Sequence, residues 1–288
     1  MPMLGEMRRK IEQEFENASR NTNRNKIAGF ERGDAYGHEA GMPIERWVKA
    51  ILDEIDWSKG NVRNYFPNDF LTEIFSRIGK DERKIENALE QVWWAPLIVS
   101  PKQIRQFLNG QNIERWQQEG GDIILFYGTD FLKDISNVVL INVKSHDLGR
   151  ASRPPNIMSA QRLLEYFADL LEREYFGQVL GKVNLWFLGV DYTVHGSVAV
   201  VDKVHIRDLF LLDLSKLPQI NFDAAIQIQW HVRDMNEIQQ DKLTFVENLA
   251  KTFISQWKAH SERKEAKYGT LVEKIKKLVK RMREISNS

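Results

Sequence analysis

Two short apolar runs, DIILFY (residues 122–127) and VVLINV (residues 138–143), decide the predicted fold of this chain. Both runs are rich in β-branched and aromatic residues, which favour strands, and the turn-forming segment GTDFLKDIS separates them. We therefore predict a β-hairpin. Side chains two residues apart share one face of a strand, so Asn142 and Lys144 project together, and Asp122 can lie beside them.

Further patterns surround this hairpin. Apolar residues at helical spacing predict helices over residues 41–55, 66–78, 82–93 and 158–175. Pro43 suits the first turn of the first of these helices. Apolar or alternating runs predict strands over residues 183–190, 197–206 and 225–232. In the last run the polar residues alternate with apolar ones and should form one polar face: Gln227, Gln229, His231 and Arg233.

These patterns predict an α/β protein with a mixed central β-sheet flanked by helices and a long helical C-terminal segment. No internal repeat or low-complexity linker divides the 288 residues. We expect one domain with a helical N-terminal part (about 1–95), a catalytic core (about 96–235) and a basic helical extension (about 236–288).

Composition excludes several classes of protein. The chain has no cysteine, which excludes a disulfide scaffold, a thiolate zinc site and a cysteine nucleophile. The N-terminus is polar and is not a signal peptide, and no apolar run approaches the roughly 20 residues of a membrane helix. We expect a cytoplasmic protein with no membrane partner.

The formal net charge of +1 conceals a strong segregation of charge. Residues 258–288 contain ten Lys or Arg and four Asp or Glu, a net charge of +6, so the rest of the chain carries −5. The basic segment has apolar residues at helical spacing: Leu271, Ile275, Val279 and Met282. It is consistent with a solvated amphipathic helix and with a helix that faces phosphates, and the two roles can coexist.

The predicted hairpin also carries the candidate chemistry. An Asp, a second oxygen ligand and a Lys that converge on one face suit a Mg²⁺ site acting on a phosphate. Lys144 could hold or help deprotonate an attacking water and stabilise charge on the phosphate. On spacing alone, an edge strand with polar groups in solvent is the commoner explanation of such a pattern.

Longer stretches carry a family resemblance. They are GHEAGMPIERWV (37–48), SPK (100–102), GDIIL (121–125), NVKS (142–145), PPNIMSAQRL (154–163) and INFDAAIQIQWHVRD (220–234). In this order they resemble the HincII-like type II restriction endonucleases, within the PD-(D/E)xK nuclease superfamily. The resemblance implies a restriction-endonuclease-like fold over most of the chain, outside the first ~30 residues and the basic extension.

The resemblance also implies roles for individual residues. Mg²⁺ would be held by Asp122, Asn142 and Val143, with Lys144 as the catalytic lysine and Glu45 as a secondary acidic residue. The implied DNA-binding residues are Lys102, Arg150, Arg153, Asn156, Asn221, Gln227, Gln229 and His231. Arg153 and Pro154 stand where a family member has glutamine and alanine, so the recognition details need not transfer.

The function implied by this resemblance is Mg²⁺-dependent hydrolysis of both strands of duplex DNA by a homodimer at a short palindromic site. A GT…AC-type six-base site and a blunt cut would follow, in a bacterial or archaeal cytoplasm with a cognate DNA methyltransferase acting on the same site. The alternatives are a repair or structure-specific nuclease of the same superfamily and a DNA-binding protein that does not cleave.

Position 142 departs from the family pattern, which has a metal-binding aspartate there. Asparagine offers a neutral carbonyl oxygen, so the site loses one negative charge. Either the variation is natural and Glu45 or Asp147 supplies charge, or the asparagine is an introduced substitution that permits binding without cleavage. We favour the second explanation because the rest of the motif is intact.

Overall fold

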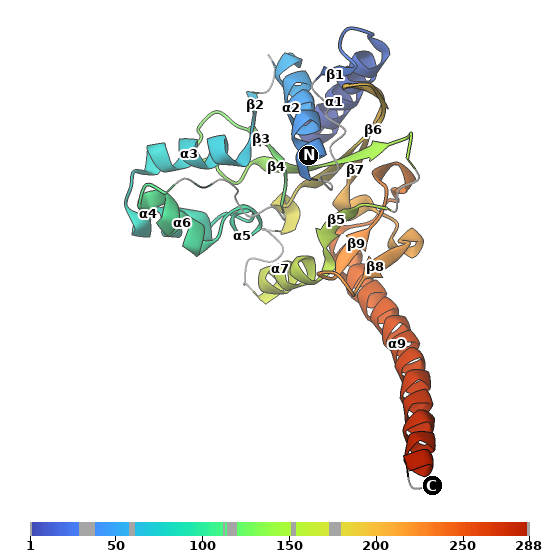
Figure 1. The fold of residues 1–288 in the computed structure, drawn as a ribbon. Coiled ribbons are helices and arrows are strands. Elements are labelled where there is room, and N and C mark those ends of the chain that lie inside the picture. The colour runs from blue at the N-terminus through green and yellow to red at the C-terminus, as the bar shows by residue number, and fades with distance from the viewer. Residues whose placement is uncertain are drawn as a thin grey trace.

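A six-stranded mixed sheet forms the centre of the computed structural model, which describes residues 2–28, 38–57, 61–111, 113, 120–150, 154–172 and 180–286. The strands are β1 (Lys26–Ala28), β2 (Val62–Tyr65), β3 (Ile123–Tyr127), β4 (Val138–Asp147), β6 (Leu185–His195) and β7 (Val198–Asp208). Their order is β1-β7-β6-β4-β3-β2, and only the β4–β6 pair is parallel (Figure 1). The predicted hairpin of β3 and β4 is confirmed, with Ile123 opposite Ile141.

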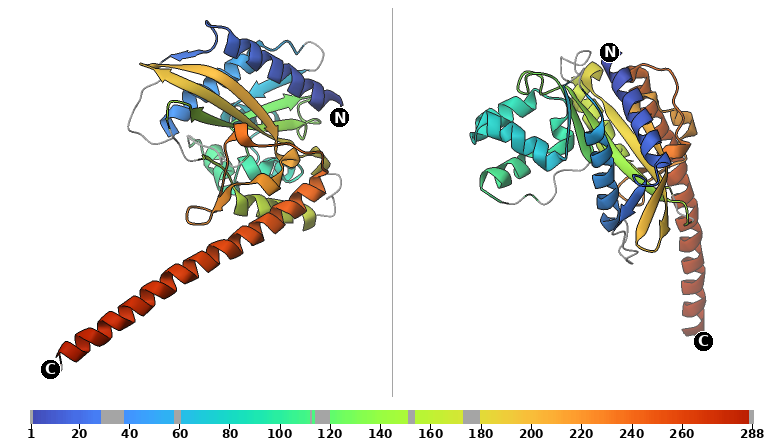
Figure 2. Two further views of the ribbon diagram at one scale, coloured as in Figure 1. Left: turned by 90° about the vertical axis from the view of Figure 1, so that its right-hand side faces the viewer. Right: turned by 90° about the horizontal axis from the view of Figure 1, so that it is seen from above.

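Two helices cover one face of this sheet, α1 (Pro2–Arg20) and α2 (His38–Glu54) (Figure 2, left). The buried stripe of α1 follows helical spacing through Met7, Ile11 and Phe15, and the Phe15 ring lies 5.6 Å from the Trp47 ring of α2. Ile141 and Val143 of β4 belong to the same apolar cluster. Since side chains alternate along a strand, Asn142 and Lys144 project from the opposite face.

The opposite face carries α7 (Ala160–Glu172), the first turns of α9 (Lys242–Ser286) and a second, three-stranded antiparallel sheet. That small sheet has the order β5-β9-β8 and consists of β5 (Asn156–Ser159), β9 (Gln227–Gln229) and β8 (Gln219–Asn221). Three short 3-10 helices join these parts: η1 (Leu209–Leu211), η2 (Leu214–Lys216) and η3 (Val232–Asp234). Rings of α7, η1 and α9 meet in the core, with Phe210 5.8 Å from Phe167 and 5.4 Å from Phe245.

Four helices form a group beside β2 and β3 (Figure 1). They are α3 (Pro67–Ile78), α4 (Glu82–Glu90), α5 (Ala95–Ile98) and α6 (Pro101–Leu108). Trp93 and Trp94 attach this group to the β3–β4 connection, because their indole N–H groups donate to the carbonyls of Ser136 and Ile135, each at 2.8 Å. Burying two indoles with their donors satisfied fixes the group against the sheet.

Several predicted boundaries were wrong. The helix predicted over 158–175 begins at Ala160, because the preceding residues pair with β9 as β5. The helix predicted over 82–93 ends at Glu90. Pro43 lies inside α2 rather than in its first turn. The N-terminal part, predicted helical, also supplies β1 and β2 to the edges of the central sheet.

The strand predicted over 225–232 is reduced to the three residues of β9. Ala225 and Ile226 both have φ of +50°, a left-handed conformation that no strand continues through. After Gln229 the chain turns into η3, which His231 precedes as its N-cap residue. His231 and Arg233 therefore leave the polar face predicted for them, and only Gln227 and Gln229 stay on β9.

The C-terminal helix α9 runs for 45 residues and extends well beyond the rest of the protein (Figures 1 and 2). Its first turns pack through the buried side chains of Phe245, Val246 and Leu249. The predicted long helical C-terminal segment is therefore confirmed, as is the α/β fold with a mixed sheet and flanking helices. Among the described residues no helix combines the length and hydropathy that a membrane span requires.

Candidate active site

Asp122 is bound to the backbone on both sides of Asn142. Its own N–H donates to the carbonyl of Ile141 at 2.8 Å, and its Oδ2 accepts from the N–H of Val143 at 2.7 Å. This close approach depends on Gly121, where a Cβ would lie 3.1 Å from the backbone N and O of Ile141. The GGD sequence thus holds a half-buried carboxylate against β4 immediately beside residue 142.

Asn142 is buried in the middle of the sheet, with 4% of its surface exposed. Its Oδ1 has no hydrogen-bond partner within the described residues. A buried amide oxygen without a donor is costly, by about 1–3 kcal/mol, and such an oxygen calls for an explanation. An oxygen that faces a site for a cation is one such explanation, and a neighbouring carboxylate strengthens it.

Lys144 follows two residues later on the same face and lines a narrow cleft. The cleft is lined by residues of β4, β6, the η3 region and the residue before β5, namely Lys144, Ser145, His146, Pro155, Gly189, Val190, Asp191, His231, Val232 and Arg233. Gly189 lies opposite Lys144 in the parallel ladder, and a Cβ on it would come within 2.5 Å of the Val232 Cβ. A glycine at this position therefore lets η3 close against β6 and form the wall of the cleft.

Asp191 is the centre of a buried polar cluster at the far side of this cleft. The His205 Nε2 lies 3.2 Å from its Oδ2, and Arg233 Nη1 lies 3.9 Å from the same oxygen. Arg233 also donates to Nδ1 of His146 at 3.0 Å. Burial would raise the pKa of Asp191, but the hydrogen bond with His205 and the electrostatic influence of His205, Arg233 and His146 outweigh it and lower that pKa.

His231 closes the same cluster. Its ring meets that of His146 edge to face at 4.5 Å, and its Nδ1 is buried with no hydrogen-bond partner in the described part of the chain. Burial is the main cause that lowers the pKa of His231, and the charges of His146 and Arg233 lower it further. A neutral His231 at the cleft wall differs from the solvent-facing strand residue that the sequence pattern predicted.

Amide side chains form a row across the small sheet. Gln229 of β9 is opposite both Asn156 of β5 and Gln219 of β8, and its Nε2 donates to Asn156 Oδ1 at 2.9 Å. Gln219 donates in turn to Gln229 Oε1. Gln227 and Asn221 form the next pair on this face, while Ile228 packs into the core. Four predicted DNA-binding residues therefore share one face: Asn156, Asn221, Gln227 and Gln229.

The other predicted site residues are dispersed. Lys102 is exposed in the first turn of α6, in the helical group, where Ser100 and Gln103 form a capping box. Arg150 is exposed in the turn after β4, with its Nε 3.6 Å from Asp147. Glu45 belongs to α2, which covers the face of β4 opposite Asn142 and Lys144. Arg153 lies outside the described residues.

The donors at Asp122 and Asn142 fit a hard divalent cation. Mg²⁺ takes oxygen ligands, is held by one or two carboxylates and keeps sites for water and substrate phosphate. The described residues contain no group of three or more His, Asp or Glu placed to hold a metal. A metal at this position would therefore depend on the Asp122 carboxylate, the buried Asn142 oxygen and backbone at Val143.

Comparison with known proteins identifies the family of this chain. The sequence model of the family "Restriction endonuclease HincII" matches residues 20–280. The chain belongs to the HincII restriction endonuclease family. The type II restriction enzymes HindII of Haemophilus influenzae strain Rd and HincII of Haemophilus influenzae are each 29% identical to it over 218 residues. Each comparison covers 74% of this chain and 77% of the relative.

Membership of the HincII family confirms the resemblance inferred from the motifs, and the match includes much of α9. The polar cluster around Asp191 was missed by sequence reasoning. One signal was present, because Asp191 interrupts an otherwise apolar run, LWFLGVDY (185–192). A buried acid in such a run usually has partners, but its partners come from strands and turns remote in sequence.

Proposed function

We propose that this member of the HincII family is a Mg²⁺-dependent type II restriction endonuclease that cuts both strands of duplex DNA as a homodimer. The observation that carries the proposal is the arrangement of Asp122, bound on both sides of Asn142, with Lys144 on the same face at the edge of the cleft. An acidic oxygen, a buried unpaired oxygen and a lysine together suit hydrolysis of a phosphodiester.

Asp122, Asn142 and Val143 are the residues that would hold Mg²⁺. When bound, Mg²⁺ supplies positive charge that polarises the scissile phosphate and stabilises the charge that develops on its oxygens. Asp122 has a defined part in this arrangement. Its hydrogen bond from Val143 fixes one carboxylate oxygen against β4, so that the carboxylate is oriented before substrate binds.

Lys144 acts on the reacting groups directly in this proposal. Its ammonium group has three donors and can orient the attacking water and the phosphate oxygens in the cleft. A lysine beside developing negative charge also stabilises it electrostatically. Gly189 and Val232 shape the wall beside Lys144, and the Asp191 cluster holds Arg233 and His146 in place behind it.

The amide row of the small sheet supports a role in reading base edges. Asparagine and glutamine pair with adenine through two hydrogen bonds, and Asn156, Gln227 and Gln229 present such side chains from one rigid sheet. Lys102, Arg150 and Arg153 would contact phosphates. A palindromic site read by a two-fold symmetric dimer, of the GT…AC type with a blunt cut, is the proposed specificity.

The biological setting follows from the proposed activity. A chain that cuts a short palindrome requires a cognate DNA methyltransferase to protect the same site in its own genome. We propose that it is located in a bacterial or archaeal cytoplasm. The two relatives named above come from a bacterium.

The test is to incubate the chain and its Asn142→Asp variant with phage DNA and Mg²⁺. We expect discrete fragments from the Asn142→Asp variant and weak or no cleavage from the chain as it stands. The control adds Lys144→Ala to Asn142→Asp, which should abolish cutting while gel shifts still detect DNA binding. Cutting that survives Lys144→Ala would contradict the assignment of this site.

A second function is favoured by one observation, the asparagine at position 142. A chain that lacks the second carboxylate could bind its DNA site without cleaving it. Specific, salt-sensitive binding with no fragments even after Asn142→Asp would support that function, because restoring the charge would then restore nothing.

A further inference from the structure

The distal half of α9 carries a regular apolar seam that remains open to solvent. Tyr268, Leu271, Ile275 and Leu278 follow one another at intervals of three, four and three residues. Their exposed fractions are 52%, 49%, 50% and 50%. The sequence continues the same spacing with Met282. This is the seam of a heptad repeat, with Tyr268 and Ile275 at a positions and Leu271 and Leu278 at d positions.

The rest of the protein holds only the proximal part of this helix. Phe222 packs on Trp257 with ring centroids 5.2 Å apart, and Asp223 pairs with Lys264 at 2.7 Å. Beyond Lys264 the side chains are exposed as far as residue 279. A helix that continues for about six further turns with half-exposed leucines and isoleucine buries too little apolar surface to be stabilised on its own.

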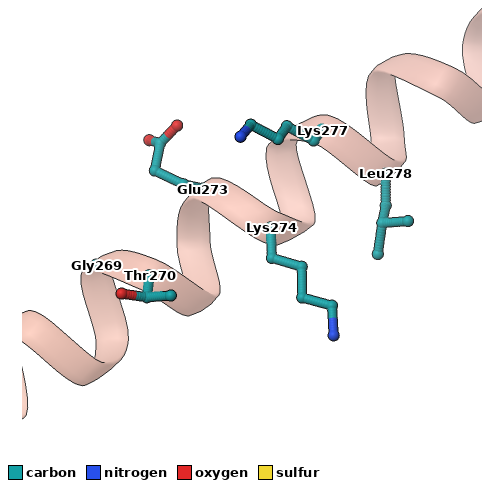
Figure 3. Close-up of a pocket in the computed structure, with 6 residues that line it drawn as sticks. All are labelled: Gly269, Thr270, Glu273, Lys274, Lys277 and Leu278. Carbon is teal, nitrogen blue, oxygen red and sulfur yellow. The ribbon is translucent and has the colours of Figure 1, made fainter.

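Polar residues occupy the other side of the helix. Figure 3 shows Glu273 and Lys277 projecting on one side and Leu278 on the opposite side. Lys276 pairs with Glu273 at 2.8 Å, which is a contact of the solvent side of the helix. The segment is thus an amphipathic helix of the kind found in coiled coils, with an apolar stripe that can pack on a partner helix and a polar face that is exposed to solvent.

We propose that residues 265–286 of α9 form a parallel, in-register two-stranded coiled coil with the same segment of a second copy of this chain. Isoleucine at an a position with leucine at d positions is the combination that favours parallel dimers. The occupant is a second copy because a heptad seam is complementary to itself when two identical helices lie side by side.

The flanking positions select the parallel orientation. Lys267 and Lys274 occupy g positions, and Val272 and Val279 occupy e positions with 48% and 44% of their surfaces exposed. In a parallel pair each g lysine lies beside an e valine of the other copy, and its aliphatic stem can cover that valine. In an antiparallel pair the g lysines would face one another, and like charges would repel.

This inference goes beyond the proposed nuclease activity and does not depend on it, so its cross-linking test contains no DNA. The chain has no cysteine, so single cysteines can be introduced into the full-length protein without background. Leu271→Cys and Leu278→Cys are prepared separately, oxidised and analysed on a non-reducing gel. The matched control is Lys277→Cys, one residue away on the solvent side of the helix.

We expect both seam variants to form cross-linked dimers and Lys277→Cys to remain largely uncross-linked. A parallel in-register pair places every residue opposite its own copy, whereas an antiparallel pair can do so at only one layer. Cross-linking of one seam variant alone would therefore overturn the parallel arrangement. If neither seam variant cross-links above the control, the proposal is wrong. Unchanged thermal unfolding of each variant establishes that the protein is folded.

A second pair of variants tests the seam itself. In an Ile275→Cys background, Leu271→Glu with Leu278→Glu should abolish cross-linking, whereas Ala266→Glu with Thr270→Glu, which adds the same charge on the outer face, should retain it. Equal cross-linking in the two would contradict the proposal. A second result would also contradict it, because it would show that the basic helix binds DNA instead. In that case the seam variants do not cross-link, and Lys274→Glu and Lys277→Glu weaken retention of duplex DNA at low salt.

Discussion

The Oδ2 of Asp122 accepts a hydrogen bond from the N–H of Val143 at 2.7 Å, and the Asp122 N–H donates to the Ile141 carbonyl at 2.8 Å. The carboxylate is therefore tied to β4 on both sides of Asn142. This arrangement places the Asp122 carboxylate against the backbone that flanks residue 142, so the charges of residues 122 and 142 belong to one compact site.

Asn142→Asp should couple stability to Mg²⁺. The variant places a second carboxylate in a buried position beside Asp122, so without metal the two like charges and the loss of hydration destabilise the fold. Mg²⁺ binds the folded form and restores stability by mass action. We expect a lower melting temperature in EDTA than the parent chain, a clear rise on adding Mg²⁺, and an increase in cleavage of roughly 100-fold or more.

Differential scanning fluorimetry with Mg²⁺ and with EDTA measures this coupling. The parent chain and the variant Asn184→Asp serve as controls, since Asn184 is a buried asparagine whose Nδ2 donates to backbone carbonyls of Val138 and Lys182. If Mg²⁺ raised the melting temperature of Asn184→Asp as much as that of Asn142→Asp, the assignment of residue 142 as a metal ligand would be contradicted.

Gly189→Ala should narrow the cleft beside Lys144. The added Cβ would meet the Val232 Cβ at 2.5 Å, so η3 must shift, and we expect a loss of about 1–3 kcal/mol in the free energy of unfolding. Val232→Gly removes the Cβ that clashes and should restore part of that loss in the double variant. Urea unfolding of the four proteins in this cycle measures the coupling energy. Strictly additive effects on the free energy of unfolding would show that the contact with Val232 is not what excludes a larger residue at position 189.

The free energy of unfolding should fall as the pH is lowered from 7 to 5, because His231 becomes protonated. The folded protein binds a proton at His231 less readily than the unfolded chain, whose histidine has a pKa of about 6.5. Protonation below that value therefore favours unfolding, and stability rises again with pH. Asp191 has the opposite sign: its pKa is lowered, so its contribution persists in this window and is lost only below about pH 4.

The variants His231→Gln and Asp191→Asn separate these effects. His231→Gln should flatten the loss of stability between pH 7 and pH 5. Asp191→Asn should cost about 1–3 kcal/mol at pH 7, because within the described residues it leaves His205 without its charged partner and Arg233 with Asp234 as its one acidic partner. Chemical denaturation at several pH values measures both. An unchanged pH profile for His231→Gln would contradict the assignment of this residue to the buried cluster.

Gln229→Ala should weaken specific DNA binding without destabilising the protein. Gln229 links Asn156 and Gln219 in the amide row, so its loss should cost about 1–3 kcal/mol of discrimination between the cognate site and other DNA. Gel shifts with cognate and scrambled duplexes measure this ratio. The control is Gln161→Ala, an exposed glutamine of α7 that pairs with Glu165. Equal effects of the two variants would exclude base reading by the row.

Much of the fold was predictable because its local signals are strong. The runs over 122–127 and 138–143 are apolar and β-branched, and they pair as predicted. The apolar spacing of residues 41–55 correctly predicts a helix, and Ile44, Val48 and Ile51 of α2 lie in the hydrophobic core. The small sheet was less visible, since its strands have three or four residues and depend on pairing between segments about 70 residues apart in the chain.

The candidate site was predictable in part for the same reason. Asp122, Asn142 and Lys144 come from one hairpin, so their proximity follows from strand periodicity and one turn. The cluster of Asp191, His205, His146 and Arg233 depends on the parallel pairing of β4 with β6 and on η3, which no local pattern specifies. The displacement of His231 follows from the turn into η3 after Gln229. The late start of β9 follows from the left-handed Ala225 and Ile226, where no glycine signals that conformation in the sequence.

The central claim is that Asp122, residue 142 and Lys144 form the cleavage site of a sequence-specific nuclease. The most direct measurement sequences the ends of the fragments that Asn142→Asp produces from a reference genome in Mg²⁺. We expect all ends to fall within one short palindrome, and we expect the added Lys144→Ala substitution to remove them. Random ends, or no fragments from either the chain or its Asn142→Asp variant, would contradict it.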